Sequence, residues 1–139
     1  MATTTAAVTL ASDLLSDNMS VTTDTTCMKG GSASDGLTQM DMGYLEVATG
    51  TNFDLLDAEN TNNVNKANKV YVSNDSTDET YYVVVTIDAQ VVGRLYAGDW
   101  MFIPADFHDA AADIAITSNG GTNKIEYALF HEGTVLVTT

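Results

Sequence analysis

Short runs in which apolar and polar residues alternate recur along most of this chain. Near the start, Ala6, Val8 and Leu10 alternate with Ala7 and Thr9. Successive side chains of a β-strand point to opposite faces, so alternation of this kind predicts strands. Further runs of this kind are Met19–Thr23, Tyr44–Val47, Lys69–Ser73, Ile114–Thr117, Ile125–Phe130 and Val135–Val137.

The run Tyr81–Ile87 is apolar at almost every position. Apolar residues on both faces are typical of a central strand or of a strand that a partner covers. Helical periodicity is weak, and the best helical candidate, Asp106–Asp113, is long enough for a short turn only. Strands spaced about 8 to 12 residues apart predict an all-β fold, namely an antiparallel β-sandwich or a jelly-roll-like barrel with an extended N-terminal arm.

Turn residues separate the expected strands. Asn74–Glu79 is polar and Asp-rich and predicts a solvated hairpin loop, and Asn119–Asn123 contains two glycines and predicts a hairpin-type turn. The 139 residues suit a single domain. Within it, residues 1–42 are expected to supply strands and an arm or loop that packs on the same or a neighbouring subunit, and residues 43–139 the sandwich core.

The charge of the chain narrows its possible partners. Asp and Glu number 19 against 5 Lys and Arg, a formal net charge of −14. Binding to phosphates needs clustered basic side chains, so we expect no nucleic-acid partner and no anionic membrane surface. No apolar run approaches the roughly 20 residues of a membrane span. The single cysteine, Cys27, cannot form a disulfide within the chain and is expected to be a small hydrophobic residue in a strand or loop.

Three groups of residues are candidates for a chemical site. Gly98–His108 resembles the second motif of cupins, but a cupin metal site needs three histidines and this chain has two. His131 and Glu132 are adjacent and would face opposite sides of a strand. The loop Asn74–Glu79 lacks the spacing of an EF-hand. We therefore predict a protein that is not an enzyme, without catalytic residues, cofactor or metal.

The aromatic residues leave three interpretations open: core, subunit interface or sugar-stacking platform. We predict that Trp100 and Phe102 belong to the core, and that Tyr82 and Val84 lie at an interface. The apolar positions of the first two expected strands and of the last one are also expected to lie at an interface. The predicted interface residues are Ala6, Val8, Leu10, Met19, Val21, Tyr82, Val84, Val135 and Val137.

Several segments carry a family resemblance. Leu95–Pro104 reads as Leu-x-x-Gly-Asp followed by an apolar strand and a proline, and Ile125–Phe130 contains Glu-Tyr. Together with Asn68–Asn74, Thr80–Val85 and the opening segment Ser16–Ser20, this layout resembles a group of short virion proteins of marine and freshwater tailed phages. The resemblance covers roughly Ala6–Ser20 and Asn68–Phe130.

This resemblance implies a capsid decoration (cement) protein that binds the outer surface of the assembled shell and stabilises it. The expected partners are the major capsid protein and further copies of the chain, as a homotrimer, and the expected location is the outer capsid surface of the virion. The alternative is a small tail or fibre component that binds a glycan or receptor. A third possibility, a cupin-like enzyme, is disfavoured by the histidine count.

Overall fold

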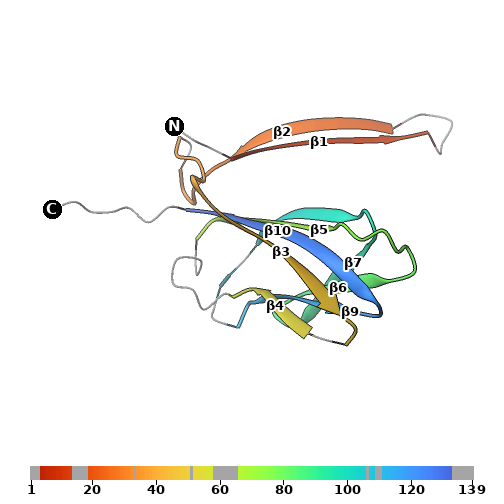
Figure 1. Cartoon of the computed structure of the whole chain (residues 1–139). Coiled ribbons are helices and arrows are strands. Elements are labelled where there is room, and N and C mark those ends of the chain that lie inside the picture. Colours follow the sequence, from red (N-terminus) through yellow and green to blue (C-terminus); the bar gives the residue numbers. More distant parts are fainter. Residues whose placement is uncertain are drawn as a thin grey trace.

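The computed structural model describes residues 4–13, 19–32, 34–50, 52–57, 66–105, 107–108 and 111–132, and all regular structure in them is β (Figure 1). The expected all-β, antiparallel sandwich is confirmed. The strands are β1 (Thr4–Ser12), β2 (Met19–Cys27), β3 (Gln39–Ala48), β4 (Asn52–Leu56), β5 (Asn68–Asn74), β6 (Tyr82–Ile87), β7 (Gln90–Tyr96), β8 (Trp100–Ala105), β9 (Ile114–Ser118) and β10 (Thr122–His131).

Strands β3 to β10 form two four-stranded sheets, ordered β3-β10-β5-β8 and β4-β9-β6-β7. Antiparallel pairs join β3 to β10, β4 to β9, β5 to β8 and β6 to β7. Strands β3 to β10 thus form one long antiparallel ribbon that folds back at the turn between β6 and β7. The ribbon is rolled up so that its successive strand pairs alternate between the two sheets. This is the topology of a jelly roll.

The core lies between the two sheets, where the inward positions of their strands meet. Val70, Val72 and Ile125 come from one sheet, and Val83 and Ile116 from the other; all are at most 1% exposed. β6 lies between β9 and β7, so of the two expectations for the apolar run Tyr81–Ile87, a central strand or a strand that a partner covers, the first is confirmed for Tyr82–Ile87.

Two predicted hairpin turns connect different sheets instead. Residues 119–121 lead from β9 to β10, and residues 75–81 lead from β5 to β6; neither pair of strands is hydrogen-bonded to each other. The prediction of hairpins at these loops was wrong, because turn residues mark a reversal of the chain without specifying which strand pairs next. A two-residue turn joins β6 to β7, and both Asp88 (φ 49°) and Ala89 (φ 58°) are left-handed there, as a tight hairpin turn requires.

A buried polar network closes one end of the sandwich. The Asn123 side-chain amide donates to Ser118 Oγ (2.7 Å), and the Asn74 amide donates to the carbonyl of Leu95 (2.9 Å) and to Asn123 Oδ1 (3.3 Å). Asn74, Ser118 and Asn123 are each at most 2% exposed. The network satisfies polar groups that would otherwise be buried without partners, and it fixes the loops that cross between the sheets.

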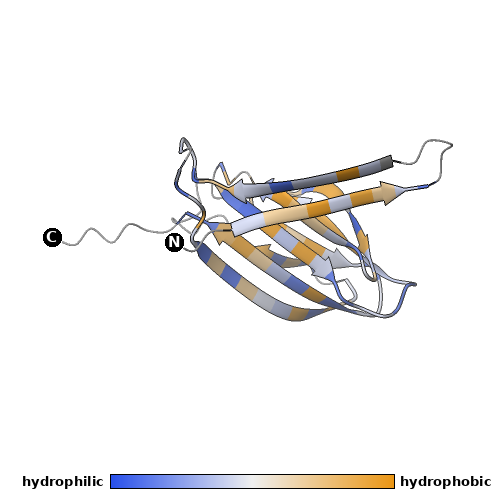
Figure 2. Cartoon of the chain, turned by 90° about the horizontal axis from the view of Figure 1, so that it is seen from above, coloured by the Kyte–Doolittle hydropathy of each residue, from blue (hydrophilic) through white to orange (hydrophobic). Residues whose placement is uncertain are grey.

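β1 and β2 form a separate two-stranded antiparallel sheet, here called the hairpin. The hairpin lies as a third layer over the outer face of the β3-β10-β5-β8 sheet (Figures 1 and 2). The N-terminal part of the chain was expected to be an extended arm that orders on a neighbour; whether it does so stays a prediction, as does the division at residue 42.

Candidate interaction surface

The outer face of the β3-β10-β5-β8 sheet is apolar, although such a face is usually solvated. The strand registers place Met42, Ala128, Tyr71 and Phe102 side by side in one row across the four strands. Met40 and Phe130 pair in the next row on one side, and Tyr44 and Trp100 lie in the next row on the other side. We call these eight residues the outer apolar face.

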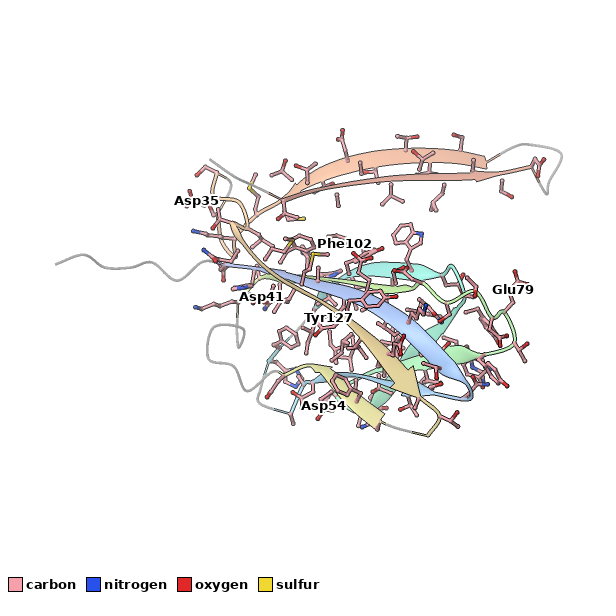
Figure 3. The ribbon with its side chains drawn as sticks, viewed as in Figure 1. Asp35, Asp41, Asp54, Glu79, Phe102 and Tyr127 are labelled. Atoms are coloured by element: carbon pink, nitrogen blue, oxygen red, sulfur yellow. The ribbon has the colours of Figure 1, made fainter. Side chains whose placement is uncertain are left out.

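Phe102 and Trp100 correct the sequence interpretation, which placed both in the core. Phe102 points from the sheet toward the hairpin, whereas Tyr127 lies between the two sheets of the sandwich (Figure 3). Trp100 is 50% exposed. In Trp100–Ile103 every residue is apolar, so the alternation that would show which residues face inward is missing; Met101 and Ile103 are the ones that pack on the core.

The hairpin directs its own apolar face toward the sheet. Its register puts Leu10 opposite Val21, with Val8 and Ala6 on the same face. Ala6 and Val8 are half-buried, whereas Leu10 is 52% and Val21 is 46% exposed. The half of the hairpin near its turn is therefore less covered than the half near Thr4 and Cys27.

A groove separates the hairpin from the sheet. One part, of about 230 Å³, lies between β1 and the aromatic residues of β5, β8 and β10. A second part, of about 380 Å³, lies at the root of the hairpin and reaches β3. The lining residues of the two parts are Thr4, Thr5, Ala6, Ala7, Val8, Leu37, Thr38, Gln39, Met40, Tyr71, Trp100, Phe102 and Phe130.

The root of the hairpin is tied firmly to the sandwich. Glu132 accepts hydrogen bonds from the backbone N–H of Gly30 (3.0 Å) and of Ala67 (3.1 Å), one on each carboxylate oxygen. Leu37 is fully buried, and its N–H donates to the carbonyl of Cys27 (2.8 Å). Cys27 is the last residue of β2 and is 4% exposed, which agrees with the expected small hydrophobic residue in a strand or loop. The hairpin therefore leaves the sandwich from a fixed point.

Charge is almost absent from the hairpin and balanced on the sheet face beneath it. Asp24 is the one Asp, Glu, Lys, Arg or His in β1 and β2. On the outer side of the sheet, the registers place two acidic residues, Glu46 and Glu126, and two basic residues, Lys69 and Lys124. In a chain of net charge −14, this layer is locally close to neutral.

A second, smaller surface surrounds Tyr82 on the outer face of the β4-β9-β6-β7 sheet. The rings of Tyr82 and Tyr96 lie 5.1 Å apart, and the guanidinium of Arg94 lies 4.5 Å from the centre of the Tyr82 ring. A hydrogen bond to Tyr96, and after it the charge interaction with Tyr82, raise the pKa of Arg94 above its ordinary value. Val84 lies on the same face, half-buried, opposite Arg94 in the register.

The predicted interface residues thus fall into three sets. Ala6, Val8, Leu10 and Val21 share one face of the hairpin, and Tyr82 and Val84 lie together on the opposite side of the molecule. Met19 is part of β2, but its side chain lies outside the described residues, as do Val135 and Val137.

Side chains of two of the candidate chemical sites make polar contacts within the fold. His131 Nε2 lies 3.0 Å from Asp41 Oδ2, at the edge of the sheet. In the Asp-rich loop, Asp75 accepts from the Ser73 hydroxyl (2.6 Å), and Asp78 accepts from the Thr80 N–H (2.9 Å). Among the described residues, no group of three or more His, Cys, Asp or Glu is placed to hold a metal ion, and no helix long and apolar enough to cross a membrane occurs.

Comparison with known proteins gives no family. No protein-family model matches the chain, and no curated protein sequence matches it.

Sequence reasoning missed most of the outer apolar face. Met40, Met42 and Tyr44 alternate with Asp41 and Gly43. Further along the same strand the apolar residues Leu45 and Val47 occupy the other set of alternate positions. β3 therefore carries apolar side chains on both faces, as β6 does. The same two-sided criterion that identified Tyr82 and Val84 would have found this strand.

Proposed function

We propose that the protein is a structural component of a phage virion, a decoration protein that binds the outer surface of the assembled capsid and stabilises it. The observation that carries the proposal is the outer apolar face, together with the hairpin anchored above it. The sequence resemblance to short virion proteins supports the same function, and jelly rolls occur among viral capsid domains.

Physical arguments agree with this role. Exposed apolar patches of this kind mark sites of protein–protein contact. A protein that binds only the assembled shell shifts the equilibrium toward that shell by mass action. The strongly acidic remainder of the chain keeps it away from packaged DNA. The proposed partners are the major capsid protein and further copies of this chain, in a homotrimer.

A specific observation favours a second candidate function, glycan or receptor binding by a tail or fibre component. Half-buried Tyr82 and exposed Tyr96 form an aromatic pair beside Arg94. Polar residues flank the pair, since Asn119 accepts from the N–H of Tyr82 (2.8 Å) and Asp99 accepts from the N–H of Tyr96 (2.9 Å). Sugars stack on such rings, and a glycan array with wild type and Tyr82→Ala tests this function.

The deciding experiment is the copy number per virion. Quantitative mass spectrometry of purified particles gives the ratio of this protein to the major capsid protein. A copy number near that of the capsid subunits supports decoration. A dozen copies or fewer would contradict it and favour the tail component.

Removal of Met1–Leu10 tests the contribution of the hairpin. This deletion takes away most of β1, including Ala6 and Val8, and leaves β3 to β10 intact. We expect the truncated protein to bind particles that lack the wild-type protein at least about tenfold more weakly, the equivalent of about 1.4 kcal/mol. Cosedimentation with particles measures this, and unchanged binding would show that the hairpin makes no contact with the shell.

A further inference from the structure

The hairpin and the β3 strand each present an apolar surface that the single chain leaves uncovered. Leu10 (52% exposed) and Val21 (46%) lie on the hairpin near its turn. Met40, Met42 and Tyr44 on β3 are 54%, 58% and 58% exposed, and we call them the β3 strip. Within the chain, β1 instead covers Tyr71, Phe102 and Phe130 on the neighbouring strands.

A two-stranded hairpin is at best marginally stable in water without a surface to pack on. Each strand of this hairpin has nine residues, about 30 Å at roughly 3.4 Å per residue, and the described contacts fix it at its root. The half near the turn needs further apolar cover, and the β3 strip needs the same. Both surfaces are apolar, so packing one on the other would remove both from water.

We propose that a second copy of this chain supplies the missing cover: the hairpin of each copy packs Leu10 and Val21 on the β3 strip of another copy. In the proposed homotrimer the exchange closes as a ring of three, which leaves no hairpin without a strip. The inference deepens the self-association that belongs to the proposed function, and it names the surface responsible.

Charge favours a second copy of this chain as the occupant, because this is the side on which two strongly acidic copies repel each other least. Two molecules of net charge −14 repel each other over most of their surfaces. The hairpin carries Asp24 alone, and the outer side of the sheet balances Glu46 and Glu126 against Lys69 and Lys124. Two of the five basic residues of the chain thus lie on this side. It is a surface on which copies can meet without a strong penalty from like charges.

Distance along the strands argues against the same contact within one chain. Met40 lines the groove with Thr4 and Thr5 at the root of the hairpin, and Met42 lies two residues further along β3. Leu10 lies six residues from Thr4, about 20 Å along β1. We therefore expect a contact between Leu10 and Met42 to report a second copy.

Substitutions at the exposed positions test the exchange. We expect the purified wild-type protein to sediment as an oligomer at micromolar concentrations. Leu10→Asp and Met42→Asp should each weaken association at least about tenfold, because each buries a carboxylate in the contact. Val91→Asp, at a 70% exposed position on β7 of the other sheet, is the matched control and should keep the wild-type mass. A monomeric wild type, or Leu10→Asp and Met42→Asp proteins with the wild-type mass, would overturn the exchange.

Disulfide trapping gives a second readout that does not depend on loss of assembly. Leu10→Cys and Met42→Cys proteins, each with Cys27→Ala, are mixed and oxidised. We expect a covalent heterodimer joined through positions 10 and 42, whereas Val91→Cys mixed with Met42→Cys should give none above background. Equal yields from the two mixtures would overturn the proposal.

The two proposals can fail separately. The exchange is measured on free protein, and copy number is measured on virions. If the free protein is a monomer but occurs on virions at a copy number near that of the capsid subunits, the exchange is overturned and the proposed function stands.

Discussion

At the scale of single residues, one glycine makes room for the largest side chain that enters the core from β10. Gly43 lies opposite Tyr127 in the β3–β10 register. A Cβ on Gly43 would lie 2.4 Å from the Tyr127 hydroxyl oxygen and 2.5 Å from the ring carbon that bears it. Real Cβ atoms do not approach so closely, so either the ring or the backbone would have to move. The sequence shows Gly43 as an interruption of a strand, and only the register shows why it is there.

Gly43→Ala should therefore destabilise the protein by about 1–3 kcal/mol, the usual cost of overpacking a core. Urea denaturation measures this change. Gly93→Ala on β7 is the matched control, because a Cβ there meets no atom within 4 Å, and it should change the free energy of unfolding by less than about 0.5 kcal/mol. Equal effects of the two substitutions would show that Tyr127 does not need the space.

At the scale of elements, the strands follow from the sequence better than their connections do. The alternating runs near Ala6, Leu45 and Ile125 all lie in strands. The polar loops between strands were read as hairpin turns, although residues 75–81 and 119–121 cross between the sheets. Alternation is a local property of the chain, whereas strand pairing depends on how β3 to β10 roll up into two sheets. The local pattern therefore cannot choose between a hairpin and a crossover.

The anchoring of the hairpin is also an element-scale feature. Both oxygens of the Glu132 carboxylate are engaged, one by Gly30 in the loop after β2 and one by Ala67 just before β5. Glu132→Ala removes both acceptors, so we expect faster hydrogen–deuterium exchange at the amides of Gly30 and Ala67 and in peptides from the hairpin. The loss of global stability should be about 1 kcal/mol, because these hydrogen bonds are partly exposed to solvent.

Glu79→Ala is the control for this prediction, since Glu79 is an exposed carboxylate in the loop between β5 and β6. It removes the same charge without touching the root of the hairpin. Exchange of the hairpin peptides at the wild-type rate in the Glu132→Ala protein would mean that Leu37 and Cys27 hold the root without the carboxylate.

At the scale of the whole molecule, charge works against compactness. A net charge of −14 on 139 residues produces self-repulsion that salt screens, with a Debye length of about 10 Å at 0.1 M. Raising NaCl from low concentration to about 0.3 M should raise the melting temperature by roughly 3–5 °C at neutral pH, which corresponds to about 1 kcal/mol. Differential scanning calorimetry measures the shift.

The same titration near pH 4.1, where the net charge of the chain vanishes, is the control. Salt should have little effect on the melting temperature there, because there is no net repulsion to screen. A fall in melting temperature with salt at neutral pH would show that specific ion pairs outweigh the net charge.

The sequence by itself determined the class of fold, the acidic character and the strands, because alternation and composition are local or additive properties. It also predicted a shared face for Ala6, Val8 and Leu10, since residues two apart point the same way from a strand. Only the tertiary structure decided that Trp100 and Phe102 face outward and that Met40, Met42 and Tyr44 join them on one surface. Which side of an all-apolar strand is inside depends on the register with strands distant in sequence, and that register exists only once the two sheets have closed on each other.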